Sequence, residues 1–244
     1  MDNFPSNLYF IVTDHSIRDL NHKYTIIDGQ VAEPEAIKNR EIIQGIAKAN
    51  HLCFLNQVHG NEVYYAQEPQ PLGEEVAADA FYTDKAGILL CIRTADCCPI
   101  ILYSDDGTII GGAHAGWRGA RANIVRNLHN KMSKYASEFS AIIGPTICQE
   151  SYEVGQEFYD NFMQEDARFE DFFIASEKGY YFDLSSFVQK QLQELGISKI
   201  HKITEDTYTT KLPDGSYKYP SYRRHCHIGE DYPRSIITAI MIKP

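Results

Sequence analysis

Residues 108–119 read TIIGGAHAGWRG and join a strand pattern to a helix pattern. The β-branched residues of the first half predict a strand over residues 108–113, and the glycines that follow it mark a turn. Beyond the turn, Ile124, Leu128 and Met132 recur at four-residue intervals, which is the spacing of an amphipathic helix. The stretch therefore predicts a strand that runs through a glycine turn into a helix.

Short apolar runs separated by Gly, Pro and Asp-Gly turn signals lie on both sides of this stretch. Strands are predicted at residues 8–13, 52–58, 62–65, 80–83, 88–93, 100–103, 139–143 and 236–242, and further helices at residues 33–49, 156–164 and 185–195. Because strands and helices do not alternate strictly, an α+β layer fold is favoured over a doubly wound sheet. No linker rich in Pro, Gly or Ser divides the chain, so we expect one domain over residues 1–244.

The chain carries 23 Lys and Arg against 33 Asp and Glu, a net charge of −10. This balance argues against nucleic acid and membrane surfaces as partners and favours a small molecule. A local pair such as Arg223-Arg224 can still bind an anion, because a site responds to its nearest charges. The N-terminus lacks the features of a secretory signal, no run is long enough to span a bilayer, and the six cysteines are scattered. We expect a cytoplasmic protein.

Three segments each place a side chain that can bind a metal at the end of a predicted strand, beside Gly or Pro. They are residues 56–60 (NQVHG), 94–99 (TADCCP) and 113–119 (AHAGWRG). Each segment alone is weak, since a His beside a Gly is usually a turn residue and a Cys on a strand is usually a small core residue. The argument for a metal therefore rests on the three together.

Together the segments supply His59, Cys97 and His114, two imidazoles and one thiolate. This is a donor set that zinc favours, and three protein ligands leave a fourth position open, as in catalytic sites. A structural zinc site would more often use a fourth ligand and a short Cys-x-x-Cys spacing, which is absent from the sequence. We expect a catalytic zinc ion, one per chain, with copper the less favoured metal.

The turn after His114 suggests a second role for the same segment. Gly116 and Arg118 lie where a strand meets a helix, and unpaired backbone N–H groups together with a guanidinium can bind an anion such as phosphate. A plain glycine turn, with Trp117 packed into the core, is an equally good reading of the spacing. Both interpretations stay open from the sequence.

Six ordered motifs give the chain a family resemblance. They are Gln57-Val58-His59-Gly60, Asp79-Ala80, Thr94-Ala95-Asp96-Cys97, His114-Ala115-Gly116-Trp117-Arg118-Gly119, Ile143-Gly144-Pro145 with Tyr152-Glu153-Val154-Gly155, and Ser221-Tyr222-Arg223-Arg224. In this order they resemble the YfiH-like family, whose members are also called polyphenol oxidase or laccase-domain proteins, and they span nearly the whole chain.

The resemblance implies an enzyme that phosphorolyses adenosine, inosine and S-methyl-5′-thioadenosine and also deaminates adenosine. It implies a zinc ion held by two His and one Cys, which map onto His59, Cys97 and His114, and a layered α/β/β/α fold with mixed sheets in the centre. Purine nucleosides and inorganic phosphate are then the expected partners, and the expected assembly is a monomer or a weak homodimer.

Other residues receive roles through the chemistry that this activity needs. Deamination needs a hydroxide and a proton shuttle, and Asp96 and Asp79 are candidates for the shuttle or for orienting a ligand histidine. We prefer the orienting role for Asp96. Phosphorolysis needs a cation at the phosphate, for which Arg118 is the candidate, with Gly116, Asp79, Asn56 and Arg223 as further substrate contacts. Arg93 reads as a surface cation at a strand end.

Two places depart from the family pattern. A Cys-Thr pair is usual where this chain has Asp206-Thr207, and a Gly-Arg usually follows the Arg pair, where this chain has Gly229-Glu230-Asp231. Substrate contacts beyond Arg223 are therefore not transferred. His225-Cys226-His227 is an additional cluster that we interpret as a loop feature, since three consecutive side chains do not converge easily on one ion.

Three other functions remain open. A copper-dependent phenol oxidase also uses two His and a Cys, although nine His with one His-x-His pair are few for several copper centres. A metal-free cysteine hydrolase would use Cys97 as nucleophile and His114 as base and would leave His59 without a role. A binding protein that kept the fold is the non-enzymatic alternative.

Overall fold

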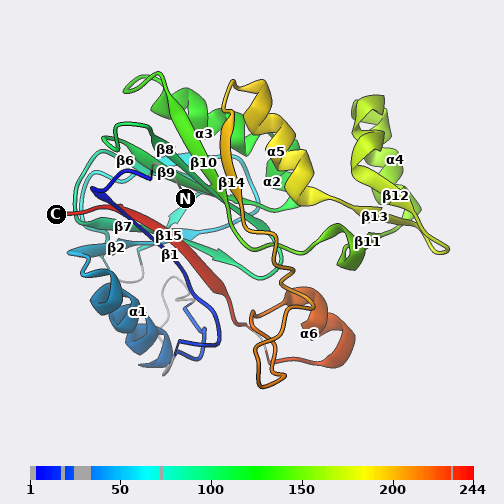
Figure 1. Cartoon of the computed structure of the whole chain (residues 1–244), viewed down its shortest axis with the longest axis horizontal. Helices are drawn as coiled ribbons and strands as arrows, with labels where there is room; N and C mark the ends of the chain where they lie inside the picture. The colour runs from blue at the N-terminus through cyan, green and yellow to red at the C-terminus, as the bar shows by residue number, and fades with distance from the viewer. Residues whose placement is uncertain (1–3, 18–19, 25–33, 72–73, 232) are drawn as a thin grey trace.

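Two mixed β-sheets stack face to face in the computed structural model, and helices cover their outer faces (Figure 1). The structure describes residues 4–17, 20–24, 34–71, 74–231 and 233–244. The four-stranded sheet has the order β1 (Leu8–Val12), β15 (Ile236–Ile242), β7 (Ile88–Thr94), β2 (His51–Cys53). The six-stranded sheet has the order β14 (Lys199–Lys202), β10 (Phe139–Ile143), β8 (Cys98–Ser104), β9 (Ile110–Ala115), β6 (Ala80–Thr83), β4 (Val63–Tyr65).

The remaining elements surround these sheets. The helices are α1 (Pro34–Ala47), α2 (Trp117–Arg121), α3 (Ile124–Met132), α4 (Gln156–Glu165), α5 (Leu184–Glu194) and α6 (Tyr222–Ile228), with 3₁₀ turns at Gln149–Ser151 and Ala167–Phe172. A small sheet of β11 (Glu153–Val154), β13 (Tyr180–Phe182) and β12 (Phe173–Ala175) projects beside α4 (Figure 1). A two-stranded sheet pairs β3 (Leu55–Asn56) with β5 (Val76–Ala77).

Strand periodicity explains how three separate cores arise. On β8, Ile101 and Tyr103 join the core between the two sheets, whereas Ile100 and Leu102 join the core under α3 and α5. On the other sheet, alternate residues such as Leu89 face the core that contains residues of α1. Because both faces of each central strand are covered, the strands are largely apolar, with polar residues such as Arg93 and Ser104 near their ends. The α+β class and the α/β/β/α layers expected from the sequence are confirmed.

The Gly111-Gly112 pair on β9 lets the layers approach each other. A Cβ on Gly111 would lie 2.6 Å from the sulfur of Met132 on α3, and a Cβ on Gly112 would lie 2.8 Å from Cδ1 of Ile92 on β7. The two missing side chains thus admit the helix on one face of the strand and the second sheet on the other. Gly111 and Gly112 therefore let β9 pack closely against α3 on one face and against β7 on the other.

Two predictions about elements need correction, and a third is confirmed with an addition. The helix expected through Ile124, Leu128 and Met132 is α3, but the glycine turn before it contains a further helix, α2, and Asn123 between the two has φ 63°. The strand expected at residues 52–58 is divided between β2 and β3, which belong to different sheets. His225-Cys226-His227 lies on α6 and not in a loop. The first residue of the helix predicted at 33–49 lies outside the described residues. No helix in the described ranges is both long and apolar enough to cross a bilayer.

Candidate active site

His59, Cys97 and His114 come together from three separate segments. His59 follows β3, Cys97 lies between β7 and β8, and His114 lies on β9. Their candidate ligand atoms are all within 4.8 Å of one another, and the two imidazole rings meet edge to face with centroids 4.8 Å apart. Within the described part of the chain, this is the one group of three or more His, Cys, Asp or Glu side chains with metal-binding spacing. The donor set fits a metal ion.

Strand pairing explains how Cys97 reaches His114. β8 and β9 are antiparallel, with Pro99 opposite His114 and Cys98 opposite Ala115, so Cys97 comes beside Gly116. A Cβ at Gly116 would lie 3.0 Å from Cδ2 of His59 and 3.1 Å from Sγ of Cys97. The bare backbone at Gly116 therefore leaves space between two of the candidate ligands.

Asp79 holds two of the three segments in place. Its side chain is fully buried, and its Oδ1 lies 2.8 Å from Nδ1 of His114, which leaves Nε2 of that ring for a metal. The same carboxylate accepts hydrogen bonds from the backbone N–H groups of Val58, His59 and Gly60 at 3.1, 2.9 and 2.7 Å. One carboxylate thus orients a ligand ring and fixes the loop that carries another ligand.

His59 needs this support because its backbone is in the left-handed region, with φ 61°. The loop is also tied to the helices, since Asn61 Nδ2 donates to the carbonyl of Ala122 and Asn127 Nδ2 donates to the carbonyl of Asn61. These bonds come from α3 and the α2–α3 junction. α3 and the junction before it therefore help to position His59.

The ionisation of the site follows from its packing. Burial opposes a charge on Cys97, but interactions with His114 and His59 outweigh it and lower the pKa of Cys97 to about 6. Burial also opposes a charge on His114, but Cys97 and Asp79 raise its pKa to about 9. The pKa of Asp79 is lowered, because its hydrogen bonds to His114 and the loop outweigh its desolvation. The ligand set is thus poised to present a thiolate.

Asp96 does not orient a ligand histidine, which corrects our preference from the sequence. Its carboxylate accepts hydrogen bonds from the hydroxyls of Thr207 and Ser221 and from the backbone N–H of Arg223, at 2.7, 3.0 and 2.6 Å. Its carbonyl accepts a bond from Thr146 Oγ1 at 2.7 Å, and its φ is 90°. Asp96 therefore joins the turn before Cys97 to the start of α6, and the histidine is oriented by Asp79.

A cavity of about 400 Å³ opens beside His59 and Cys97. The other residues that line it are Ala95, Asp96, Trp117, Arg118, Ile147, Tyr152, Leu184, Tyr222, Arg223, Cys226 and His227. Of the expected substrate contacts, Arg118 and Arg223 line this cavity, whereas Gly116 and Asp79 contribute no lining. The volume suits a small organic ligand.

Two residues lie elsewhere than expected. Asn56 is exposed on β3 and does not line the cavity. Arg93 is not a surface cation, because its side chain is 10% exposed and bonds Glu75 at 2.8 Å, in a buried cluster that also contains Arg40. Gln57 exchanges two hydrogen bonds with the backbone of Arg93. Together with the bond from Arg93 to the carbonyl of Leu55, these contacts link β7 to the β3 segment that precedes His59.

Sequence reasoning missed the cavity wall that α6 provides. Tyr222, Cys226 and His227 line the cavity, although the sequence predicts a loop for residues 225–227. Ser221 caps the helix by accepting from the backbone N–H of Arg224, and Gly229 ends it with φ 73°. A Ser that can cap the start of a helix is followed eight residues later by a Gly that can end one, and Tyr222 and Cys226 between them have helical spacing. These are sequence signals that could have predicted the helix.

The chain belongs to the family described as multi-copper polyphenol oxidoreductase laccase, whose family model matches residues 12–238. Among curated proteins it is 40% identical over 240 residues to a purine nucleoside phosphorylase of Rickettsia conorii, covering 97% of each chain. It is also 32% identical over 168 residues to the purine nucleoside phosphorylase YfiH of Escherichia coli, covering 68% of this chain and 67% of YfiH. The resemblance to YfiH-like proteins is confirmed.

Solved structures agree with this assignment. A Neisseria meningitidis protein of the family called DUF152 superimposes with a TM-score of 0.80 at 26% identity, covering 99% of this chain and 97% of that one. YfiH of Bacillus licheniformis superimposes with a TM-score of 0.77 at 23% identity, covering 92% and 86%, which shows a shared fold. The fold and the family are therefore those expected from the six motifs.

Proposed function

We propose that this chain is a zinc-dependent purine nucleoside phosphorylase that acts on adenosine, inosine and S-methyl-5′-thioadenosine, and that it also deaminates adenosine. The observation that carries the proposal is the meeting of His59, Cys97 and His114 beside a cavity of about 400 Å³, which His59 and Cys97 line. The names of the relatives in Rickettsia conorii and Escherichia coli support the phosphorylase part.

The donor set supports zinc. Two imidazole nitrogens and a thiolate suit zinc and leave an open position, and the bond from Asp79 to His114 is the kind of outer contact that fixes a ligand ring. When bound, zinc would supply Lewis acidity, which stabilises charge that develops on a leaving purine and makes water a better nucleophile.

The chain's own side chains have separate tasks in this proposal. In phosphorolysis the bond between C1′ and the purine nitrogen breaks, a phosphate oxygen bonds to C1′, and the purine leaves with a proton. Arg118 and Arg223, which line the cavity, would bind the phosphate dianion, and Trp117 and Tyr152 offer aromatic surface to the base. In deamination, water replaces the amino group of adenosine and ammonia leaves.

The test is a product analysis on protein whose metal content has been measured. Wild type should hold about one zinc ion per chain, release adenine and ribose 1-phosphate from adenosine only with phosphate, and form inosine without it. Cys97→Ala should lose zinc and both products, whereas Cys148→Ala, which removes a thiol outside the cavity lining, should keep them. Absence of both products from zinc-loaded wild type would refute the proposal.

A cysteine hydrolase is the second candidate, because the lowered pKa of Cys97 beside His114 also suits a nucleophilic thiolate. It predicts activity on amides or esters that survives removal of the metal and depends on Cys97. A phenol oxidase, suggested by the family description, predicts bound copper and oxygen consumption with phenols. The same metal analysis separates these functions.

A further inference from the structure

α6 presents one face to the cavity. Arg223 and His227 are four residues apart, as are Tyr222 and Cys226, and all four line the cavity together with His59 and Cys97. Asp96 fixes the start of the helix, since its carboxylate accepts hydrogen bonds from the hydroxyl of Ser221 and from the backbone N–H of Arg223. α6 is therefore held in a fixed position at the wall of the cavity.

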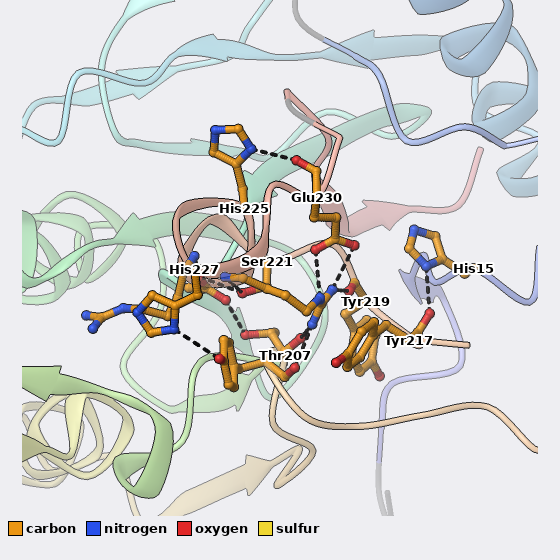
Figure 2. Close-up of polar contacts among 12 residues, drawn as sticks. His15, Thr207, Tyr217, Tyr219, Ser221, His225, His227 and Glu230 are labelled. Atoms are coloured by element: carbon orange, nitrogen blue, oxygen red, sulfur yellow. Dashed lines mark hydrogen bonds and ion pairs between the residues drawn. The ribbon is translucent and has the colours of Figure 1, made fainter. Parts of the chain in front are cut away.

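The ring of His227 is oriented by Tyr208. Its Nδ1 lies 3.0 Å from the hydroxyl of Tyr208, and the two rings meet edge to face with centroids 5.6 Å apart (Figure 2). The backbone of Tyr208 is held by the buried guanidinium of Arg224, whose Nη1 donates to its carbonyl at 2.6 Å. When the hydroxyl of Tyr208 donates to Nδ1, the ring carries its proton on Nε2. His227 can then donate a hydrogen bond to a ligand in the cavity it lines.

Two arginines line this cavity although the whole protein is acidic. Arg118, Arg223 and His227 line it, and within the described residues neither arginine forms an ion pair. Arg118 lies over the ring of Trp117 at 4.4 Å, and Arg223 donates to the carbonyl of Glu153 at 2.9 Å. The acidic groups of the lining are Asp96, which already accepts three hydrogen bonds, and the thiol of Cys97, which would bind the proposed zinc ion. Such a lining favours an anion.

We propose that His227, held by Tyr208, is a phosphate-binding residue that completes the subsite of Arg118 and Arg223. The inference rests on the proposed phosphorylase function, in which inorganic phosphate is the second substrate. The phosphate oxygens would accept hydrogen bonds from the guanidinium of Arg118 on α2 and from the guanidinium of Arg223 and Nε2 of His227 on α6. The phosphoryl group of a nucleotide has the same chemistry, so the test compares the two.

Trp117 allows binding to be measured without catalysis. It is the single Trp of the chain, it lines the cavity, and the guanidinium of Arg118 lies over its ring, so an anion at Arg118 should change its fluorescence. Titration of the zinc-loaded protein with inorganic phosphate should saturate, and His227→Ala should weaken binding about tenfold, the value of one charge-assisted hydrogen bond. Tyr208→Phe, which keeps the ring but frees His227, should weaken it less.

His225→Ala is the matched control, since His225 lies on the same helix, does not line the cavity and bonds the carbonyl of Glu230 at 2.5 Å (Figure 2). It should change phosphate binding by less than about twofold. An equal effect of His225→Ala and His227→Ala would show that disturbance of α6, and not a contact from His227, weakens binding. Failure of wild type to bind phosphate, or binding of adenosine 5′-monophosphate alone, would also overturn the proposal.

Kinetics separate this proposal from the one on which it rests. His227→Ala should raise KM for phosphate about tenfold, several times more than it raises KM for adenosine, and should be partly rescued by His227→Gln. An unchanged KM for phosphate in active His227→Ala would refute the role of His227 alone. If wild type shows no phosphorolysis, the proposed function fails, whereas the fluorescence titration still decides whether His227 binds phosphate.

Discussion

Asp79 binds His114 through a hydrogen bond of 2.8 Å between Oδ1 and Nδ1, with both side chains buried. His114 is also bound to the same residue through its backbone, because its N–H donates to the carbonyl of Asp79 at 2.7 Å. The pairing of β6 with β9 creates both contacts, since Ala80 lies opposite Ala113. The imidazole is therefore fixed before any metal binds, with Nε2 directed away from Asp79.

Asp79→Asn should weaken both the metal site and the fold. An amide cannot accept all four hydrogen bonds, so metal affinity should fall about 10- to 100-fold and the free energy of unfolding by about 3 kcal/mol. Metal competition with a chelator and urea unfolding measure the two effects. Asp84→Asn, at the other end of β6 with a partly exposed side chain, should change the free energy of unfolding by less than about 1 kcal/mol. Full metal affinity in Asp79→Asn would contradict the orienting role.

Cys97 should be the reactive thiol of the metal-free protein. Because its pKa is lowered to about 6, the thiolate predominates at neutral pH and is lost as the pH falls through about 6. Alkylation by iodoacetamide, followed by mass spectrometry in a Cys226→Ser background, should therefore fall off in acid near that pH. Cys148, whose pKa is raised to about 11 by burial and nearby carboxylates, serves as the internal comparison and should react slowly.

Bound metal should protect Cys97 from this reaction. A thiolate that coordinates a metal is a poorer nucleophile toward alkylating agents, so zinc should slow modification in proportion to occupancy. The control is Cys97→Ser in the same background, which should show no acid-sensitive modification. A thiol that reacts equally fast with and without zinc would place the metal elsewhere.

Gly116→Ala should disturb the metal site without unfolding the protein. The backbone of Gly116, with φ −66° and ψ 165°, accepts any residue, but the new Cβ would press on His59 and Cys97. The ligands must then shift by a few tenths of an ångström, and metal affinity should fall about tenfold. Gly155→Ala, whose Cβ would meet nothing within 4 Å, is the matched control. Equal metal affinity in the two variants would show that the space at Gly116 is not needed.

Asp96→Asn should affect substrate binding more than metal binding. Asn tolerates the positive φ at this position, but it loses part of the set of bonds to Thr207, Ser221 and Arg223, so α6 should loosen. KM for the nucleoside and for phosphate should rise about tenfold, with zinc content unchanged and a loss of about 2 kcal/mol in stability. Asp106→Asn, in the remote β8–β9 turn, is the control. Loss of turnover at unchanged KM would instead assign Asp96 to the chemistry.

Much of the fold could be predicted from local patterns. The strands at residues 80–83 and 139–143 were found with their observed bounds, because alternating or continuous apolar runs end at Gly, Pro or Asp. β14 and the small sheet of β11, β12 and β13 were not predicted, since β14 has four residues and the other strands two or three, too few to show a period on their own. α6 was missed because its seven residues contain too few apolar positions to show a helical period.

The sequence by itself determined the class of fold and the three candidate ligands. Imidazole and thiolate groups at strand ends are recognisable by their chemistry alone, wherever the chain places them. Only the tertiary structure decided which carboxylate supports them, because Asp79 is 35 residues from His114 and Asp96 is 125 residues from Ser221. Such contacts depend on strand register and on how α6 packs against the sheet ends. Residue type and spacing along the chain do not show which residues so far apart in sequence come into contact. The choice between Asp79 and Asp96 therefore required the folded structure.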